Sequence, residues 1–148
     1  MSDYPQTLQD IGLDPNAKFK PAALRAVRRF AASKPWRGTL EERRAKFETL
    51  NRDLGEAYGV EPPLLVVAGR GEGDSGASSY CPVTNTITMR GRLSVITFLH
   101  EWGHRFHGRS EHKACRWSLN IFRKVFKKSW LRLSFEGHMA RQADIIGP

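Results

Sequence analysis

The residues best suited to chemistry are the five from 100 to 104, which read His-Glu-Trp-Gly-His. On a helix with 3.6 residues per turn, His100 and His104 project from the same face, so their imidazole rings can bind one metal ion. Glu101 is rotated by one position and points beside that ion, where its carboxylate can accept a proton from water. This spacing predicts a catalytic metal site, and we expect the metal to be Zn2+.

A third protein ligand is needed, because catalytic zinc sites usually have three. His107 lies two turns beyond His100, roughly 10 Å along the helix axis, which is too far for a shared metal unless the helix ends early. Gly108 allows the chain to reverse, which brings Glu111, in the first turn of the next helix, within reach. We therefore favour Glu111 as the third ligand. The alternatives are His107, His112 and the more distant His138.

Two helices are predicted ahead of this motif. The first begins near Pro21, where the missing N–H of proline costs least, and ends at residues 33–35. The second opens with a capping box of Thr39 and Glu42 and ends at Gly59. Their apolar residues at helical spacing are Leu24, Val27 and Ala31 in the first helix and Phe47, Leu50, Leu54 and Tyr58 in the second.

Two strands and two more helices complete the predicted elements. Residues 64–68 are typical of a buried strand, and residues 86–89 of a second short strand. The motif helix is expected from Leu93 or Ser94 to His107, with Gly108 as its stop. The next helix is expected from Ser110, a good N-cap, to about Leu133. Its apolar stripe is Ala114, Trp117, Ile121 and Val125.

The loop at residues 69–79 contains glycines at positions 71, 73 and 76, which formally match the dinucleotide-binding fingerprint. That fingerprint needs a helix to begin at once, so that its N-terminus faces the pyrophosphate. Residues 77–82 are a poor helix start. We therefore interpret the loop as a flexible connection.

The 148 residues suit one domain. We expect an irregular N-terminal arm at 1–20, one α+β domain with a zincin-like core at 21–135, and a C-terminal tail at 136–148. No apolar run approaches the roughly 20 residues that span a bilayer, and the N-terminus lacks a basic-then-apolar signal. The two cysteines cannot form a disulfide framework. These features favour a cytoplasmic protein with no membrane partner.

The net charge of +9 makes contact with nucleic acid plausible. The cations expected on the outer face of the last helix are Arg116, Arg123, Lys124, Lys127 and Lys128. Such cations are as typical of a helix face that is only exposed to solvent as of a surface that contacts phosphate. A basic nucleic-acid-binding module without catalysis is therefore the alternative function. Neither cysteine has the spacing of a structural zinc site.

Three further residues could take part in catalysis. Tyr80 and His138 could each donate a hydrogen bond to a developing oxyanion, but ordinary loop roles are favoured for both. Cys115 could be a nucleophile, but a cysteine on a helix beside Trp117 is usually a small buried hydrophobe.

The stretch from Thr86 to Phe122 resembles the gluzincin-type metallopeptidases, and specifically their ImmA/IrrE-like branch. That branch has a strand, a helix with H-E-x-G-H and a second helix that opens with E-x-x-A, here Glu111 to Ala114. The segment Tyr80 to Met89 is similar to the lead-in of that family. The resemblance implies that Glu111 is the third zinc ligand and that the chain hydrolyses peptide bonds in a protein or peptide substrate.

The resemblance covers roughly a third of the chain, and only the H-E-x-x-H part is highly specific. Two features depart from the family pattern. The gap between His104 and Glu111 is very short, and Cys115 stands where an acidic or amide residue is usual. A SprT-like protease, which acts near DNA, is similar in size and charge, but its third ligand is a histidine farther along the chain.

Overall fold

The computed structural model describes residues 12–68, 78–91 and 93–131. These residues form an α+β structure with five helices and one three-stranded sheet. Their contacts group them into two compact units, one of residues 18–93 and one of residues 94–131 with 12–17. The boundaries predicted for a single domain stay a prediction. Across the described ranges, no helix is both long and apolar enough to cross a membrane.

Parts of three predicted segments lie outside the described residues. They are the start of the arm at 1–11, most of the glycine-containing loop at 69–77, and the tail at 136–148. The rest of the arm, residues 12–20, contains no helix or strand. Asp14 donates its backbone N–H to Oδ1 of Asn120 at 2.9 Å, which fixes residues 12–17 to the unit of residues 94–131.

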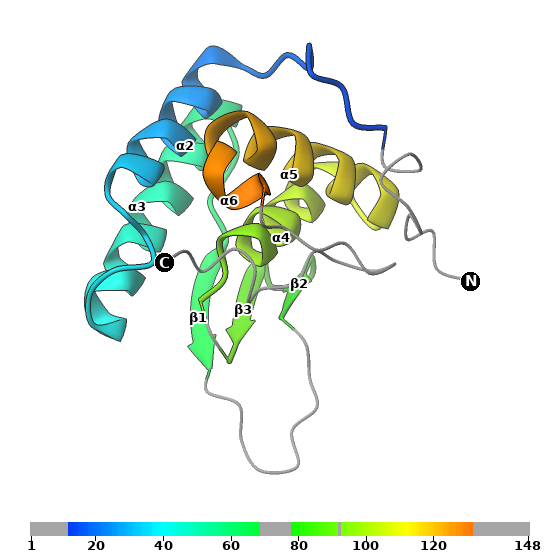
Figure 1. Cartoon of the computed structure of the whole chain (residues 1–148). Coiled ribbons are helices and arrows are strands. Elements are labelled where there is room, and N and C mark those ends of the chain that lie inside the picture. Colours follow the sequence, from blue (N-terminus) through cyan, green and yellow to red (C-terminus); the bar gives the residue numbers. More distant parts are fainter. Residues whose placement is uncertain (1–11, 69–77, 92, 132–148) are drawn as a thin grey trace. The chain divides into compact units, whose positions relative to one another are not determined.

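In the first unit, α2 (Pro21–Ala32) and α3 (Leu40–Tyr58) lie side by side (Figure 1). The predicted capping box is confirmed. The Thr39 hydroxyl accepts a hydrogen bond from Glu42 N–H, and the Glu42 carboxylate accepts one from Thr39 N–H. Gly59 ends α3 with φ of 64°, a left-handed conformation that glycine adopts without strain.

Apolar side chains of α2 and α3 meet between the two helices. The predicted face of α3 is confirmed except that Tyr58 is half-buried. The predicted face of α2 is wrong in part, because Leu24 and Ala31 are only half-buried. The Phe30 ring packs edge-on against Phe47 of α3, with 4.9 Å between centroids, so Phe30 belongs to the buried face. The buried residues of α2 are Ala23, Ala26, Val27 and Phe30.

The sheet has the strand order β1-β3-β2. β1 (Leu64–Ala68) pairs in parallel with β3 (Thr86–Arg90), and β2 (Ser79–Cys81) pairs antiparallel with β3. β2 was not predicted from the sequence, since three residues are too few to show an alternating pattern. Both predicted strands are confirmed, but β1 is not buried throughout. Leu65 is buried while Leu64 is 65% exposed, because successive side chains of a strand point to opposite faces and Leu65 is on the covered face.

The second unit contains α4 (Val95–His107), α5 (Glu111–Val125) and α6 (Lys127–Leu131). The predicted starts are confirmed: the Ser94 hydroxyl accepts the backbone N–H of Thr97, and the Ser110 hydroxyl accepts that of Lys113. Each serine thus satisfies one of the unpaired N–H groups at a helix start.

The expected continuation of the last helix to about Leu133 is wrong. α5 ends at Val125, and Phe126, with φ of −103° and ψ of 63°, is not helical. Its buried ring stacks on Phe122 with 5.0 Å between centroids. The break puts Lys127 and Lys128 on the separate helix α6.

α4 and α5 approach each other closely at Gly103. A Cβ atom added there would lie 2.9 Å from Cα of Ala114 and 3.1 Å from its Cβ. The absence of a side chain at Gly103 therefore sets the distance between the two helices. This is the close packing expected from a glycine inside the motif.

Candidate metal centre

The two motif histidines face each other from successive turns of α4. Their Nε2 atoms are 3.2 Å apart, and their rings cross at 83° with 4.8 Å between centroids. This convergence follows from the four-residue spacing, because side chains at i and i+4 lie one above the other on a helix. The predicted pairing of His100 with His104 on one face is what the structure shows.

Glu111 joins the two imidazoles from the first residue of α5. The chain reverses at Gly108, where φ is 73°, and α5 then begins after Ser110. This path places Oε2 of Glu111 3.1 Å from Nε2 of His100 and Oε1 2.7 Å from Nε2 of His104. The predicted short reversal thus brings the carboxylate to both rings.

Among the described residues, one group of three or more histidine, cysteine or acidic side chains is close enough to share a metal ion. It consists of His100, His104 and Glu111, whose potential ligand atoms all lie within 4.8 Å of one another. The alternative ligands His107 and His112 are not part of it. His107 lies at the end of α4 with its ring against Phe106, and His138 is outside the described residues.

The donor types and the spacing of the two nitrogens suit a metal ion such as zinc. Two nitrogens held about 2.0–2.1 Å from one zinc ion at tetrahedral angles lie about 3.3 Å apart. The observed separation of 3.2 Å between the Nε2 atoms of His100 and His104 agrees with this value. Two histidines and one glutamate are also a known ligand set of catalytic zinc sites, which leave a fourth position open.

The outer ring nitrogens of both histidines have contacts of their own. Nδ1 of His104 lies 2.6 Å from the carbonyl oxygen of Gly108, and Nδ1 of His100 lies 3.6 Å from Sγ of Cys115. A carbonyl oxygen can only accept, so Nδ1 of His104 carries the proton. The Nε2 of a neutral His104 is then a lone pair, which is the form that binds a metal.

With this proton on Nδ1, the Nε2 lone pair of a neutral His104 points at the carboxylate of Glu111, which is also an acceptor. Nε2 of His104 and Oε1 of Glu111 are 2.7 Å apart. Two acceptors this close share a proton, carried by the imidazole or by the carboxyl group, or bind a common metal ion.

The protonation of the two histidines differs because their surroundings differ. Burial lowers the pKa of His100 and outweighs the opposing effect of Glu111. Burial also lowers the pKa of His104, but hydrogen bonds to Glu111 and Gly108 and the charges of Glu111 and Glu101 together raise it above its usual value. A proton therefore competes with a metal at His104 and not at His100.

The triad is open to solvent on one side. The His100 side chain is 2% exposed, that of His104 is 11% exposed and that of Glu111 is 23% exposed. An ion held by these groups would thus be mostly shielded from water by protein but reachable through the His104 and Glu111 side.

Glu101 is the neighbour of this triad that was predicted to move protons. Its side chain is largely buried on α4, and its negative charge contributes to the raised pKa of His104. The carboxylate is therefore close enough to His104 to act on it, while it is not a member of the triad itself.

The other predicted residues are placed as follows. The Tyr80 hydroxyl donates to Oδ1 of Asn85 at 2.9 Å, within the β2–β3 hairpin. Cys115 is fully buried, as expected of a small hydrophobe. The five cations predicted for one helix face do not share one, because the helix ends at Val125. Arg123 lies 5.7 Å from the Trp130 ring, Lys124 is half-buried, and Arg116, Lys127 and Lys128 are exposed.

Two contacts of the candidate centre were not anticipated by the sequence analysis, namely those from Cys115 and from the Gly108 carbonyl. The position of Cys115 had a signal in the sequence. Cys115 follows Glu111 by four residues, so both side chains lie on the same face of α5. The second depends on how the chain turns after α4, which residue types alone do not specify.

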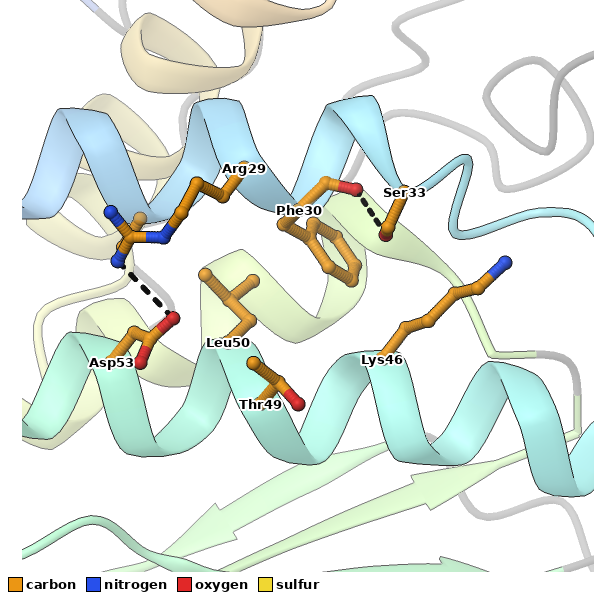
Figure 2. Close-up of a pocket in the computed structure, with 8 residues that line it drawn as sticks. Arg29, Phe30, Ser33, Lys46, Thr49, Leu50 and Asp53 are labelled. Carbon is orange, nitrogen blue, oxygen red and sulfur yellow. Dashed lines mark hydrogen bonds and ion pairs between the residues drawn. The ribbon is translucent and has the colours of Figure 1, made fainter.

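A hollow of about 160 Å³ between α2 and α3 contains none of the predicted site residues (Figure 2). Ser33, Lys46, Thr49 and Asp53 are among the side chains around it.

Comparisons of the chain with models of known protein families, with curated proteins and with solved structures find no match.

Proposed function

We propose that this chain is a zinc-dependent metallopeptidase with a zincin-like core, similar to the ImmA/IrrE-like gluzincins. The observation that carries the proposal is the convergence of Nε2 of His100, Nε2 of His104 and the carboxylate of Glu111, three potential metal ligands within 4.8 Å of one another. His100, His104 and Glu111 would hold the ion. The substrate would be a protein or peptide.

Each residue of the centre has a distinct role in this proposal. A bound zinc ion supplies Lewis acidity, which polarises a carbonyl group and lowers the pKa of water toward about 7. Glu101 accepts a proton from the attacking water and passes it to the leaving amine. The Gly108 carbonyl and Sγ of Cys115 hold the outer ring nitrogens, so that both Nε2 atoms face inward.

The adjacent carboxylate favours a hydrolase over a purely structural metal site. Structural zinc sites are usually closed by four ligands rich in cysteine. The triad here contains no cysteine ligand and stays accessible beside Glu111. A structural site would also have no use for the acid at Glu101.

The proposal is tested by loading wild-type protein and Glu101→Gln with zinc and assaying both on a fluorescently labelled unfolded protein. We expect both to bind one equivalent of zinc and only the wild type to cleave the substrate, with the rate of the variant reduced by at least ~100-fold. Glu56→Gln, an exposed change on α3, is the matched control and should cleave like the wild type.

Equal cleavage by wild type and Glu101→Gln would overturn the assignment of the base. Zinc binding without cleavage by the wild type on a broad set of unfolded proteins and peptides would count against a peptidase.

A further inference from the structure

A second region of the chain concentrates positive charge and takes no part in the proposed metal centre. Residues 15 to 40 include seven basic side chains and no acidic one. The basic residues are Lys18, Lys20, Arg25, Arg28, Arg29, Lys34 and Arg37. α2 occupies the middle of this stretch, so the helix geometry determines the directions in which its three arginines point.

Arg25 and Arg28 of α2 lie on the side turned away from α3, and Arg29 lies at the edge of that side. The buried residues of the helix face α3, with the Phe30 ring against Phe47. Arg25, Arg28 and Arg29 are exposed. Side chains three and four residues apart are neighbours on a helix surface, so these arginines form one row, which we call the α2 arginine ridge.

Arg25 and Arg28 are the members of the ridge that are available to a ligand. Within residues 12–68, 78–91 and 93–131, neither takes part in an ion pair. Arg29 instead reaches toward α3, where its Nη2 lies 3.3 Å from Oδ2 of Asp53 (Figure 2). Its side chain is still 62% exposed, so Arg29 adds to the positive field at the ridge.

We propose that Arg25 and Arg28 bind the phosphate backbone of nucleic acid. Guanidinium groups match phosphate with two parallel hydrogen bonds and remain charged at any physiological pH. A row of them with no acidic residue nearby in the sequence attracts a polyanion over a long range. Such contacts position a nucleic acid without reading its sequence, so the expected binding is not sequence-specific.

An anionic membrane is a poorer match for the same charges. A helix that binds a membrane surface inserts its apolar face among the lipid chains. The apolar face of α2 is already covered, since Val27 is fully buried and Phe30 packs on Phe47. Between its two end residues, the exposed side chains of α2 are arginines, and these suit a phosphate backbone.

The test is fluorescence anisotropy with the full chain and a labelled duplex DNA of about 20 base pairs at several NaCl concentrations, repeated with single-stranded RNA of the same length. Arg25→Gln/Arg28→Gln is expected to weaken binding about tenfold and to reduce the slope of log affinity against log salt by about 2. Lys127→Gln/Lys128→Gln, with the same charge change at exposed positions of α6, is expected to have a much smaller effect.

A second variant separates the loss of contacts from a loss of folding. Arg25→Lys/Arg28→Lys keeps both charges and should keep the salt slope while binding a few-fold more weakly, because lysine cannot make the paired hydrogen bonds. Ridge-dependent binding to either DNA or RNA supports the proposal, and the probe that binds tells which one is used.

Three results would overturn it. The first is an equal loss in the ridge variant and the α6 variant, which would indicate a response to total charge only. The second is no binding of either nucleic acid by the wild type at low salt. The third is ridge-dependent binding to phosphatidylserine vesicles and not to nucleic acid. Zinc content should be unchanged in the ridge variant, so this test is independent of the proposed peptidase.

Discussion

Nε2 of His104 lies 2.7 Å from Oε1 of Glu111, across the short turn that joins α4 to α5. This contact joins the last turn of one helix to the first turn of the next. It makes Glu111, and neither His107 nor His112, the partner of the motif histidines in the described part of the chain.

Replacing Glu111 by glutamine is expected to weaken zinc binding by at least about 100-fold, more than the 10–100-fold typical of groups that only support a ligand. The amide keeps the size of the side chain but loses the charge that the ion needs. The measurement is a competition titration with a coloured zinc chelator. His112→Ala is the control for the rival ligand and should bind zinc normally. A loss of zinc in His112→Ala with normal binding in Glu111→Gln would reverse the assignment.

The close approach of α4 and α5 predicts that Gly103→Ala is harmful. Its Cβ would lie 2.9 Å from the Cα of Ala114, so the helices must move apart. We expect the free energy of unfolding to fall by about 1–3 kcal/mol. Zinc affinity should fall as well, because His104 and Glu111 lie on the two separated helices. Thermal unfolding with and without zinc measures both effects.

The double variant Gly103→Ala/Ala114→Gly removes one of the clashing atoms and should recover part of the stability. An unchanged unfolding temperature and unchanged zinc affinity in Gly103→Ala alone would show that the helix spacing does not control the centre.

The contact between Cys115 and His100 predicts a role in orientation. Sγ of Cys115 lies 3.6 Å from Nδ1 of His100. Cys115→Ala should therefore lower zinc affinity by about 10-fold or more, because the ring loses a partner that holds it. Cys81→Ala, at the exposed cysteine, is the matched control and should leave zinc binding unchanged. Equal zinc affinities in Cys115→Ala and Cys81→Ala would show that Cys115 does not orient His100.

The raised pKa of His104 predicts that zinc binding weakens as the pH falls. His104 keeps a proton at pH values where an ordinary histidine, with a pKa of about 6.5, is losing it. Zinc must displace this proton, whereas the lowered pKa of His100 leaves that ring neutral. We expect about one proton released per zinc ion near pH 6.5.

Calorimetry in buffers of different ionisation enthalpy counts these protons. Tighter binding at lower pH, or the release of no proton near pH 6.5, would contradict the assigned state of His104.

Local signals in the sequence predict most of the elements that position the centre. The serines at 94 and 110, the capping box at Thr39 and the glycine at 108 each act within one turn of a helix end, so they can be interpreted without tertiary contacts. The i, i+4 spacing of His100 and His104 has the same local character. The reversal at Gly108 limits how far the third ligand can lie.

Two of the features that were missed depend on how elements distant in the chain pack together. The exposure of Leu64 depends on which face of β1 is covered. The contact of Cys115 with His100 depends on where α4 and α5 cross. The four-residue spacing of Cys115 from Glu111 shows only that both lie on one face of α5, and not what that face contacts.

The most direct test of the metal centre is crystallography of zinc-loaded protein with anomalous data collected at the zinc absorption edge. The proposed centre predicts one strong anomalous peak about 2.0–2.1 Å from Nε2 of both His100 and His104 and about 2.0–2.2 Å from a carboxylate oxygen of Glu111. An anomalous peak on other residues, or no peak in fully loaded protein, would contradict the account.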